Sequence, residues 1–381
     1  MTLSLYLDRL EGQSPKKLDT SMAHQTAKYF SDMQQAVEHQ AKEHDLHALA
    51  IHIDIPGAGI CGTIATGIAD LQTQRILTGK EPRRMASMTK TYTAACILRL
   101  MEIGQLDVYT SVDKWLLHDT QDILCKAGYD LSAITIKHLL NHTSGIPEYA
   151  DAEYQQLLFK DPLHKWTRHE QIERAARLKL LDSPGQVFSY SDTGYILLGE
   201  IIEQASGMPQ AQAFRELLNF NRLGLQHTWF ESLEADPQGL PERAHQYYAD
   251  IDTTALDPSF DLWGGGGLMA TMEDEARFLR ALMTGQVFEQ KDTLVKMIEI
   301  PSTNHELGYG LGIFRTIIED DDVKVEFWGH SGFWGTYFYY SQKLNLTFVE
   351  SIYQGLKPEG FDAVTLLRKA AQLNRVAREN M

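Results

Sequence analysis

Segments with the pattern of β-strands lie at both ends of this chain of 381 residues, and segments with the pattern of helices lie between them. Residues 49–55 alternate isoleucines with His52 and Asp54, as expected for a strand that is buried on one face only. Further strands are predicted at residues 59–69, 308–318, 323–328, 333–340 and 346–353. The pattern predicts an α/β fold of the α+β type, with one antiparallel sheet built from both termini.

Helices are predicted to flank this sheet at both ends of the chain. Residues 22–45 lack Gly and Pro and repeat apolar residues at spacings of three and four, from Ala27 to Ala41, which indicates an amphipathic helix. A final helix is expected at 361–378. We therefore predict an α/β domain built from residues 1–86 and 254–381, a mainly helical inserted domain at 87–253, and an active site in the cleft between them.

Ser87 and Lys90 are three residues apart at the start of a predicted helix, so they project from the same face. A serine hydroxyl is a poor nucleophile at neutral pH and needs a neighbour that accepts its proton during attack. Lys90 suits that role if burial or a nearby cation lowers its pKa, so that the amine is neutral part of the time. The unpaired amides at the helix start would favour developing negative charge on a substrate.

Two further motifs follow in the chain, Tyr190-Ser191-Asp192 and His330-Ser331-Gly332. With them the sequence resembles the family of class C β-lactamases and D-alanyl-D-alanine carboxypeptidases, whose motifs are S-x-x-K, Y-x-N and K-T-G or H-[ST]-G. Other similar stretches are residues 138–147, 264–267 and 309–312. The resemblance implies a β-lactamase/transpeptidase-like fold and a penicillin-binding or related serine hydrolase.

The resemblance also implies roles for the motif residues. Tyr190 would move protons together with Lys90, since a phenol beside a lysine cation is expected to have a lowered pKa; which of the two is the base stays open. The oxyanion hole would be formed by the backbone N–H groups of Ser87 and Phe333, the residue after His330-Ser331-Gly332 on the edge strand. Ser331, Gly332 and Phe333 would bind substrate, and a side chain at Gly332 would block its close approach.

Two departures from the family pattern bear on the substrate. Asp192 replaces Asn, and an ionised carboxylate accepts hydrogen bonds but cannot donate one to an acyl-amide carbonyl, which weakens the case for a potent β-lactamase. Asp192 is expected either to bind an amino group of the substrate or to cap a helix. His330 replaces Lys and is expected to assist catalysis at the cleft wall, with less permanent positive charge for binding a substrate carboxylate.

Charge and hydropathy exclude several classes of partner. A formal net charge of -16 argues against nucleic acid or an anionic membrane, and favours a small-molecule substrate. No run of about 18 apolar residues is present, so no membrane span is predicted. The first 17 residues lack the basic start and apolar run of a secretory signal. The sequence as written thus predicts a cytoplasmic protein, or a periplasmic or extracellular one if a leader was removed, and it does not predict the oligomeric state.

Neither a metal nor another cofactor is expected. His138 and His142 are four residues apart but lack the intervening Glu of H-E-x-x-H, and we interpret them as structural. The glycine run at 264–267 lacks the Lys-Ser or Lys-Thr of a phosphate-binding loop, so a close-packed turn beside the cleft is expected. The cysteines match neither a disulfide framework nor a zinc site and are interpreted as buried thiols: Cys61, Cys96 and Cys125.

Together these features predict a serine hydrolase that forms a covalent acyl-enzyme on Ser87 and acts on D-amino-acid peptides, esters or β-lactams. Of these activities, that of a D-alanyl-D-alanine carboxypeptidase or an esterase is the preferred prediction. Efficient class C β-lactamase activity and a catalytically silent, penicillin-binding-like receptor or scaffold are the alternatives. An α/β-hydrolase esterase is disfavoured, because the nearest match to G-x-S-x-G ends in Phe333 instead of Gly.

Overall fold

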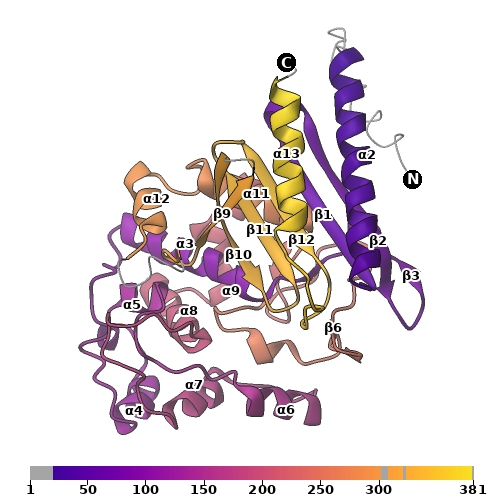
Figure 1. Ribbon diagram of the computed structural model, residues 1–381. Coiled ribbons are helices and arrows are strands. Elements are labelled where there is room, and N and C mark those ends of the chain that lie inside the picture. Colours follow the sequence, from indigo (N-terminus) through magenta and orange to yellow (C-terminus); the bar gives the residue numbers. More distant parts are fainter. Residues whose placement is uncertain (1–19, 302–307, 321–322, 380–381) are drawn as a thin grey trace.

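The computed structural model describes residues 20–301, 308–320 and 323–379, and its main feature is an antiparallel sheet (Figure 1). The strands follow the order β3-β2-β1-β12-β11-β10-β9, so β1 and β12 join the two ends of the chain. The strands are β1 (Ala48–Ile55), β2 (Ile60–Asp70), β3 (Arg75–Ile76), β9 (Phe314–Asp320), β10 (Val323–Gly332), β11 (Thr336–Ser341) and β12 (Leu346–Ser351). The predicted fold class is confirmed.

Helices cover both faces of the sheet. On one face α2 (Thr20–Glu43) and α13 (Thr365–Glu379) lie side by side, and the Tyr29 hydroxyl donates to the Ala370 carbonyl at 3.1 Å (Figure 1). The opposite face packs against α11 (Met272–Met283). The predicted flanking helices are therefore confirmed, although the buried face of α2 includes Tyr29 and leaves Ala27 exposed.

Strand β1 is buried on both faces, so the expectation of a half-buried strand was wrong. It lies between β2 and β12, and α11 covers the side on which His52 lies. His52 is buried, and its Nδ1 atom lies 2.8 Å from Thr63 Oγ1. Burial lowers the pKa of His52 to about 4, so the ring is neutral. A neutral ring can be buried on this face of the strand, which was predicted to be exposed to solvent.

The two strands around His330-Ser331-Gly332 differ from the prediction: β10 ends later and β11 begins later than expected. β10 continues through Gly332, and Phe333 lies in the turn before β11, where Gly335 has a positive φ of 64° and its N–H donates to the Gly332 carbonyl at 3.1 Å. β10 is also not the edge strand, because β9 pairs with it. That pairing ends where Gly329 lies opposite Phe314, so the last three residues of β10 are open on that side.

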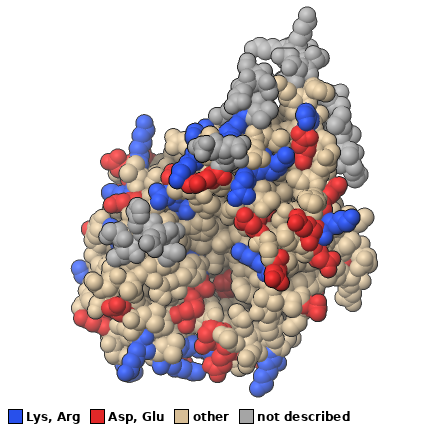
Figure 2. All heavy atoms as spheres, viewed as in Figure 1, with Lys and Arg blue, Asp and Glu red and all other residues tan. Residues whose placement is uncertain are grey.

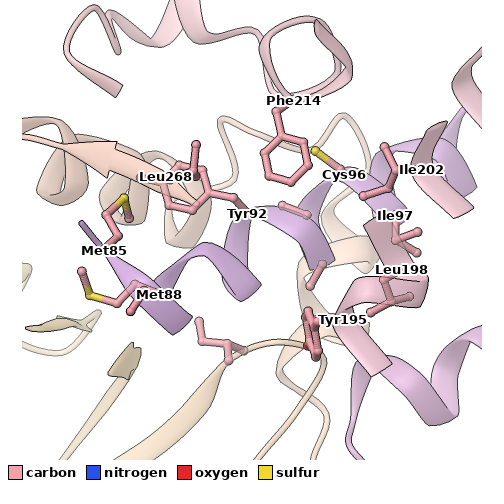
Figure 3. Close-up of a cluster of buried hydrophobic side chains, with 14 of the residues drawn as sticks. Met85, Met88, Tyr92, Cys96, Ile97, Tyr195, Leu198, Ile202, Phe214 and Leu268 are labelled. Atoms are coloured by element: carbon pink, nitrogen blue, oxygen red, sulfur yellow. The ribbon is translucent and has the colours of Figure 1, made fainter. Parts of the chain in front are cut away.

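The middle of the chain packs around the buried helix α3 (Thr89–Glu102). Figure 3 shows Tyr92 and Cys96 of α3 among apolar side chains from α8, α9 and β8. The other helices of this part are α4 (His118–Lys126), α5 (Ile136–Leu140), α6 (Ala152–Lys160), α7 (Arg168–Ala176), α8 (Asp192–Ser206), α9 (Gln210–Leu217) and α10 (Phe220–Leu223). Cys96 is buried as predicted, whereas Cys61 and Cys125 are exposed, contrary to expectation.

A small sheet connects the helical part to the rest of the chain. β8 (Leu268–Ala270) pairs on one side with β4 (Arg83–Arg84) and on the other with β5 (Thr228–Phe230). The three strands come from the three predicted segments 1–86, 87–253 and 254–381. Backbone hydrogen bonds therefore join these segments. The exact division at residues 86 and 253 stays a prediction.

None of the described helices combines the length and the apolar character that a membrane span requires. On the face shown in Figure 2, Lys and Arg side chains are scattered among Asp and Glu side chains and form no broad basic area.

Candidate active site

Ser87 lies in a tight turn directly before α3. The turn is the 3-10 helix η2 (Ala86–Met88), and α3 itself starts only at Thr89. Ala86 has a φ of 49°, a left-handed conformation that residues other than Gly seldom adopt. Such strained backbone is found where the surrounding structure holds a functional group in place. The expected position of Ser87 at a helix start is therefore refined to the turn that precedes it.

Lys90 is fully buried and points at Ser87. Its Nζ atom lies 2.8 Å from Ser87 Oγ and 2.8 Å from the carbonyl oxygen of Gly265, and it forms an ion pair with the Asp192 carboxylate. An ammonium group has three N–H donors. Each of them therefore has an acceptor, and the glycine run packs closely against Lys90 through Gly265.

The charge state of Lys90 differs from expectation. Burial acts to lower the pKa of Lys90, but the carboxylate of Asp192, with further contributions from Tyr190 and Asp261, outweighs burial and raises it. The resting side chain is thus an ammonium, not the partly neutral amine that was predicted. The cause is the departure at residue 192, because an Asn there would carry no charge.

Tyr190 completes the group around Ser87. Its phenol lies beside Ser87 and Lys90, and the Lys90 Nζ atom lies 5.1 Å from the centre of its ring. The pKa of Tyr190 is raised, because desolvation outweighs the opposing effect of Lys90. The expected lowering was therefore wrong, and the resting side chain is a neutral phenol. The structure does bring the hydroxyl, the amine and the phenol together.

The end of β10 packs on the backbone that precedes Ser87. A Cβ atom added at Gly332 would lie 2.3 Å from the Met85 carbonyl oxygen and 2.3 Å from Thr336 Oγ1. Gly332 is thus needed for close packing of protein on protein, whereas we had expected it to make room for substrate. Within the described residues, no acceptor is found for the backbone N–H groups of Ser87 and Phe333. Both groups are available to a substrate oxyanion.

We expect Gly332→Ala to destabilise the protein by about 1 to 3 kcal/mol, the usual cost of overpacking. It should also slow any reaction at Ser87, because β10 must move away from Met85. Urea unfolding and turnover of a chromogenic ester would measure the two effects. Gly57→Ala is the matched control, since a Cβ there meets nothing within 4 Å. Wild-type values of stability and turnover for Gly332→Ala would contradict this packing.

His330 does not reach the cleft with its ring. The residue is 2% exposed, and its Nε2 atom lies 2.9 Å from the hydroxyl of Tyr309. Burial, together with the cation of Lys90, lowers the pKa of His330 to about 3. We had expected a partly charged histidine at the cleft wall, and the structure instead has a buried, neutral one. Ser331 follows on β10, opposite Tyr337 of β11.

Three carboxyl groups surround Lys90, and only one of them was predicted. Asp192 is the first residue of α8, while Ser191 is its N-cap and accepts from the Gly194 N–H at 3.4 Å. The helix-capping interpretation of Asp192 was therefore wrong. Glu148 accepts from the Asp192 N–H at 2.6 Å, and Asp261 contributes to the charge on Lys90. Glu148 directly follows the motif at 138–147 and Asp261 precedes the glycine run, which are the signals that sequence reasoning missed.

Asp261 is partly exposed at the end of the 3-10 helix η4 (Pro258–Asp261). A Cβ added at Gly266 would lie 2.1 Å from Asp261 Oδ2, so the glycine makes room for this carboxylate. Gly265, the next residue back, lies against Asp192 and Lys90. In the part of the chain that the structure describes, no group hydrogen-bonds to the carboxylate of Asp261.

Aromatic side chains form another wall beside the oxyanion donors. Phe333 is 44% exposed, stacks on Tyr248 with 5.7 Å between ring centres, and meets Trp334 edge-on at 4.8 Å. Tyr248 was not predicted from the sequence. The surroundings of Ser87 thus have an acidic side and an apolar side.

Neither histidine of the segment 138–142 belongs to a metal site. His138 takes part in the capping box of α5 together with Thr135. His142 is buried behind Tyr190, with 4.2 Å between the ring centres. Among the described residues, no group of three or more His, Cys, Asp or Glu side chains could hold a metal ion.

The fold and this arrangement of Ser, Lys and Tyr are those of a serine hydrolase of the penicillin-recognising class. The family model described as Beta-lactamase matches residues 33–369, so the chain belongs to that family. The resemblance found in the motifs is thereby confirmed.

The relatives include proteins with several names. The chain is 27% identical to penicillin-binding protein 4* of Bacillus subtilis over 287 residues, which cover 71% of this chain and 60% of that protein. It is also 27% identical to esterase EstB of Burkholderia gladioli, over 67% of this chain and 72% of the esterase. The fold is similar to that of a D-stereospecific amidohydrolase from Streptomyces sp., with a TM-score of 0.76, 24% identity and coverage of 89% of this chain and 98% of that one.

Proposed function

We propose that this protein hydrolyses small amides or esters through a covalent acyl-enzyme on Ser87. The observation that carries the proposal is the contact of the Ser87 hydroxyl with both the buried Lys90 ammonium, at 2.8 Å, and the Tyr190 phenol. The backbone N–H groups of Ser87 and Phe333, for which the described residues provide no acceptor, support it further, because a tetrahedral intermediate needs such donors.

The protonation states support a concerted proton relay. Lys90 and Tyr190 both carry their protons at rest, so neither is a ready base. Ser87 would transfer its proton to the Tyr190 oxygen while Tyr190 transfers its own proton to the leaving nitrogen or oxygen. The bond from Ser87 Oγ to the acyl carbon forms, and the bond from that carbon to the leaving group breaks. The Lys90 ammonium stabilises negative charge on both oxygens, and water then releases the acyl group by the reverse relay.

The acidic side of the cleft favours a substrate with a free amino group. Asp192 forms an ion pair with Lys90, and burial raises the pKa of Glu148 to about 8, so that Glu148 is mostly neutral at pH 7. Among the described residues no group hydrogen-bonds to Asp261, and above its pKa of about 7 a substrate ammonium bound between Asp192 and Asp261 would offset its negative charge. We therefore propose amides or short peptides of D-amino acids, with an apolar side chain against Phe333 and Tyr248. The structural similarity to a D-stereospecific amidohydrolase supports this substrate class.

A panel of four compounds tests the proposal: D-phenylalanine amide, its N-acetyl derivative, L-phenylalanine amide and a chromogenic cephalosporin. We expect the free D-amide to be hydrolysed best, by about tenfold or more over the N-acetyl compound, since hydrogen bonds to charged groups contribute about 1.5 to 3 kcal/mol. Equal rates for the free and acetylated amides would contradict the amine site. Fast cephalosporin turnover would instead favour the efficient β-lactamase, and no acylation by any compound would favour the silent receptor.

The effect of pH on KM should differ between a substrate with a free amino group and its N-acetyl derivative. Burial raises the pKa of Asp261 to about 7, with Asp192 and Glu231 adding to the effect and Lys90 and Arg84 opposing it. As pH falls from 8 to 6, Asp261 gains a proton and the site loses a negative charge, so KM for the amine substrate should rise when it is calculated for the ammonium form, because an α-amino group itself titrates near about 7.7 to 8.0. KM for the N-acetyl substrate should change far less. Parallel changes in the two KM values would count against Asp261 as a ligand of the amine.

A further inference from the structure

A chain of hydrogen bonds runs behind the candidate active site through His142, Tyr309 and His330. The Ser191 N–H lies 3.1 Å from His142 Nδ1, and His142 Nε2 lies 3.1 Å from the Tyr309 hydroxyl oxygen. That oxygen lies 2.9 Å from His330 Nε2, and His330 Nδ1 lies 2.7 Å from the Ser331 carbonyl oxygen. The three side chains are each no more than 4% exposed.

The direction of this chain is set at its Ser191 end. A backbone N–H can only donate, so His142 Nδ1 is an acceptor and its ring proton is on Nε2, which donates to the Tyr309 oxygen. At the other end, His330 Nδ1 lies 2.7 Å from the Ser331 carbonyl oxygen and 3.0 Å from the Ser331 backbone nitrogen, so the contacts allow the His330 proton on either ring nitrogen. In both tautomers the His330 ring is neutral and lies in contact with Tyr309 and Ser331.

The surroundings also favour neutral rings. Burial lowers the pKa of His142 well below its ordinary value, with Lys90 and His330 adding to the effect. Burial and Lys90 likewise lower the pKa of His330, to about 3. The ammonium of Lys90 would repel a second cation so close to it.

The two ends of the chain lie at the two motifs that must meet around Ser87. Ser191 separates Tyr190 from Asp192, so the bond from its N–H fixes the backbone that carries the phenol and the carboxylate. Ser331 precedes Gly332 and the N–H of Phe333. The segments are distant in sequence, and a chain of three rings sets the spacing between them more rigidly than separate contacts with solvent would.

We propose that His142, Tyr309 and His330 are positioning residues that hold Tyr190 and the Phe333 N–H in register, and that no proton moves along them during the reaction. The effect on rates rests on the proposed function, whereas the hydrogen-bond pattern itself does not. His330 thus acts through its neighbours and does not touch the substrate.

Variants of Tyr309 and His330 separate positioning from proton transfer. We expect Tyr309→Phe to lower kcat by about 10- to 100-fold with KM changed by less than about threefold, because small misplacements of reacting groups are costly. His330→Gln keeps an acceptor towards Tyr309 and should retain most activity with an unchanged pH profile, whereas His330→Leu should behave like Tyr309→Phe. Tyr129→Phe is the matched control for folding, since Tyr129 is also 4% exposed and donates to backbone carbonyls far from the site. An equal loss in His330→Gln and His330→Leu would show that the imidazole itself is required and would overturn the proposal.

A spectroscopic measurement tests the pattern without any substrate. Long-range proton–nitrogen NMR spectra of the histidine rings, assigned by the signals that the variants lose, should show both rings neutral from pH 5 to 9, with the His142 proton on Nε2. Titration of either ring in that range, or a proton on His142 Nδ1 in the neutral ring, would contradict the inference. If the wild type hydrolyses none of the test compounds but these spectra hold, the proposed function fails and the hydrogen-bonded chain does not.

Discussion

Ser87→Ala should lower kcat by about a thousandfold or more, because the hydroxyl that forms the acyl bond is gone and only binding and the oxyanion donors are left. Stability should hardly change. Among the described residues, the side chain interacts with Lys90 and Tyr190, and the Lys90 ammonium keeps its bonds to Gly265 and Asp192. Steady-state turnover of a chromogenic ester and a thermal melt would measure the two effects on the same preparation.

Ser132→Ala provides the control for this experiment, since Ser132 is an exposed serine distant in sequence from the motifs. Substantial ester turnover by Ser87→Ala would mean that another group is the nucleophile. A large drop in melting temperature would mean that the lost activity reports on folding instead of chemistry, and Ser87→Gly would then be the variant to compare.

Asp192→Asn should lower the preference for a free amine over its N-acetyl derivative by about ten- to a hundredfold, as expected when a charged hydrogen-bond partner is removed. An amide at this position cannot form an ion pair with the substrate ammonium. The same change removes the largest influence that raises the pKa of Lys90, so that pKa should fall and a larger fraction of Lys90 should be neutral and able to accept the Ser87 proton. We therefore expect the N-acetyl substrate to be hydrolysed as fast as before or faster.

The ratio of kcat/KM for the two substrates is the quantity to measure, because it cancels losses that both share. Asp122→Asn is a suitable control, since that carboxylate is a half-exposed one on α4, where it pairs with Lys126. An unchanged ratio in Asp192→Asn would show that the residue serves only to hold Lys90 and that the amine, if bound at all, binds elsewhere.

The sequence was sufficient to predict the sheet, the flanking helices and the residues that gather around Ser87, because these depend on periodicity and on motifs. It could not predict which strands are covered on both faces by other parts of the chain. β1 reads as half buried, but α11 comes from a distant segment to cover its other face. For the same reason the direction of the Lys90 pKa shift was misjudged, since it depends on Asp192, Tyr190 and Asp261, which folding brings around Lys90.

The missed and misplaced site residues have a similar cause. Glu148 and Asp261 have no motif of their own, and their relevance comes from their position beside Asp192 and Lys90. The sequence identified His330 but could not tell where its ring points. Only the contact with Tyr309 shows that the ring faces the interior.

The central claim is that the Ser87 hydroxyl, with Lys90 and Tyr190 beside it, forms a covalent acyl-enzyme. Rapid acid quenching during turnover of a nitrophenyl ester, followed by intact mass measurement and peptide mapping, tests it most directly. We predict one added acyl group per chain, located on Ser87, and none on Ser87→Ala under the same conditions. An acyl group found on a different residue, or ester turnover with no acylated protein at any quench time, would contradict the account.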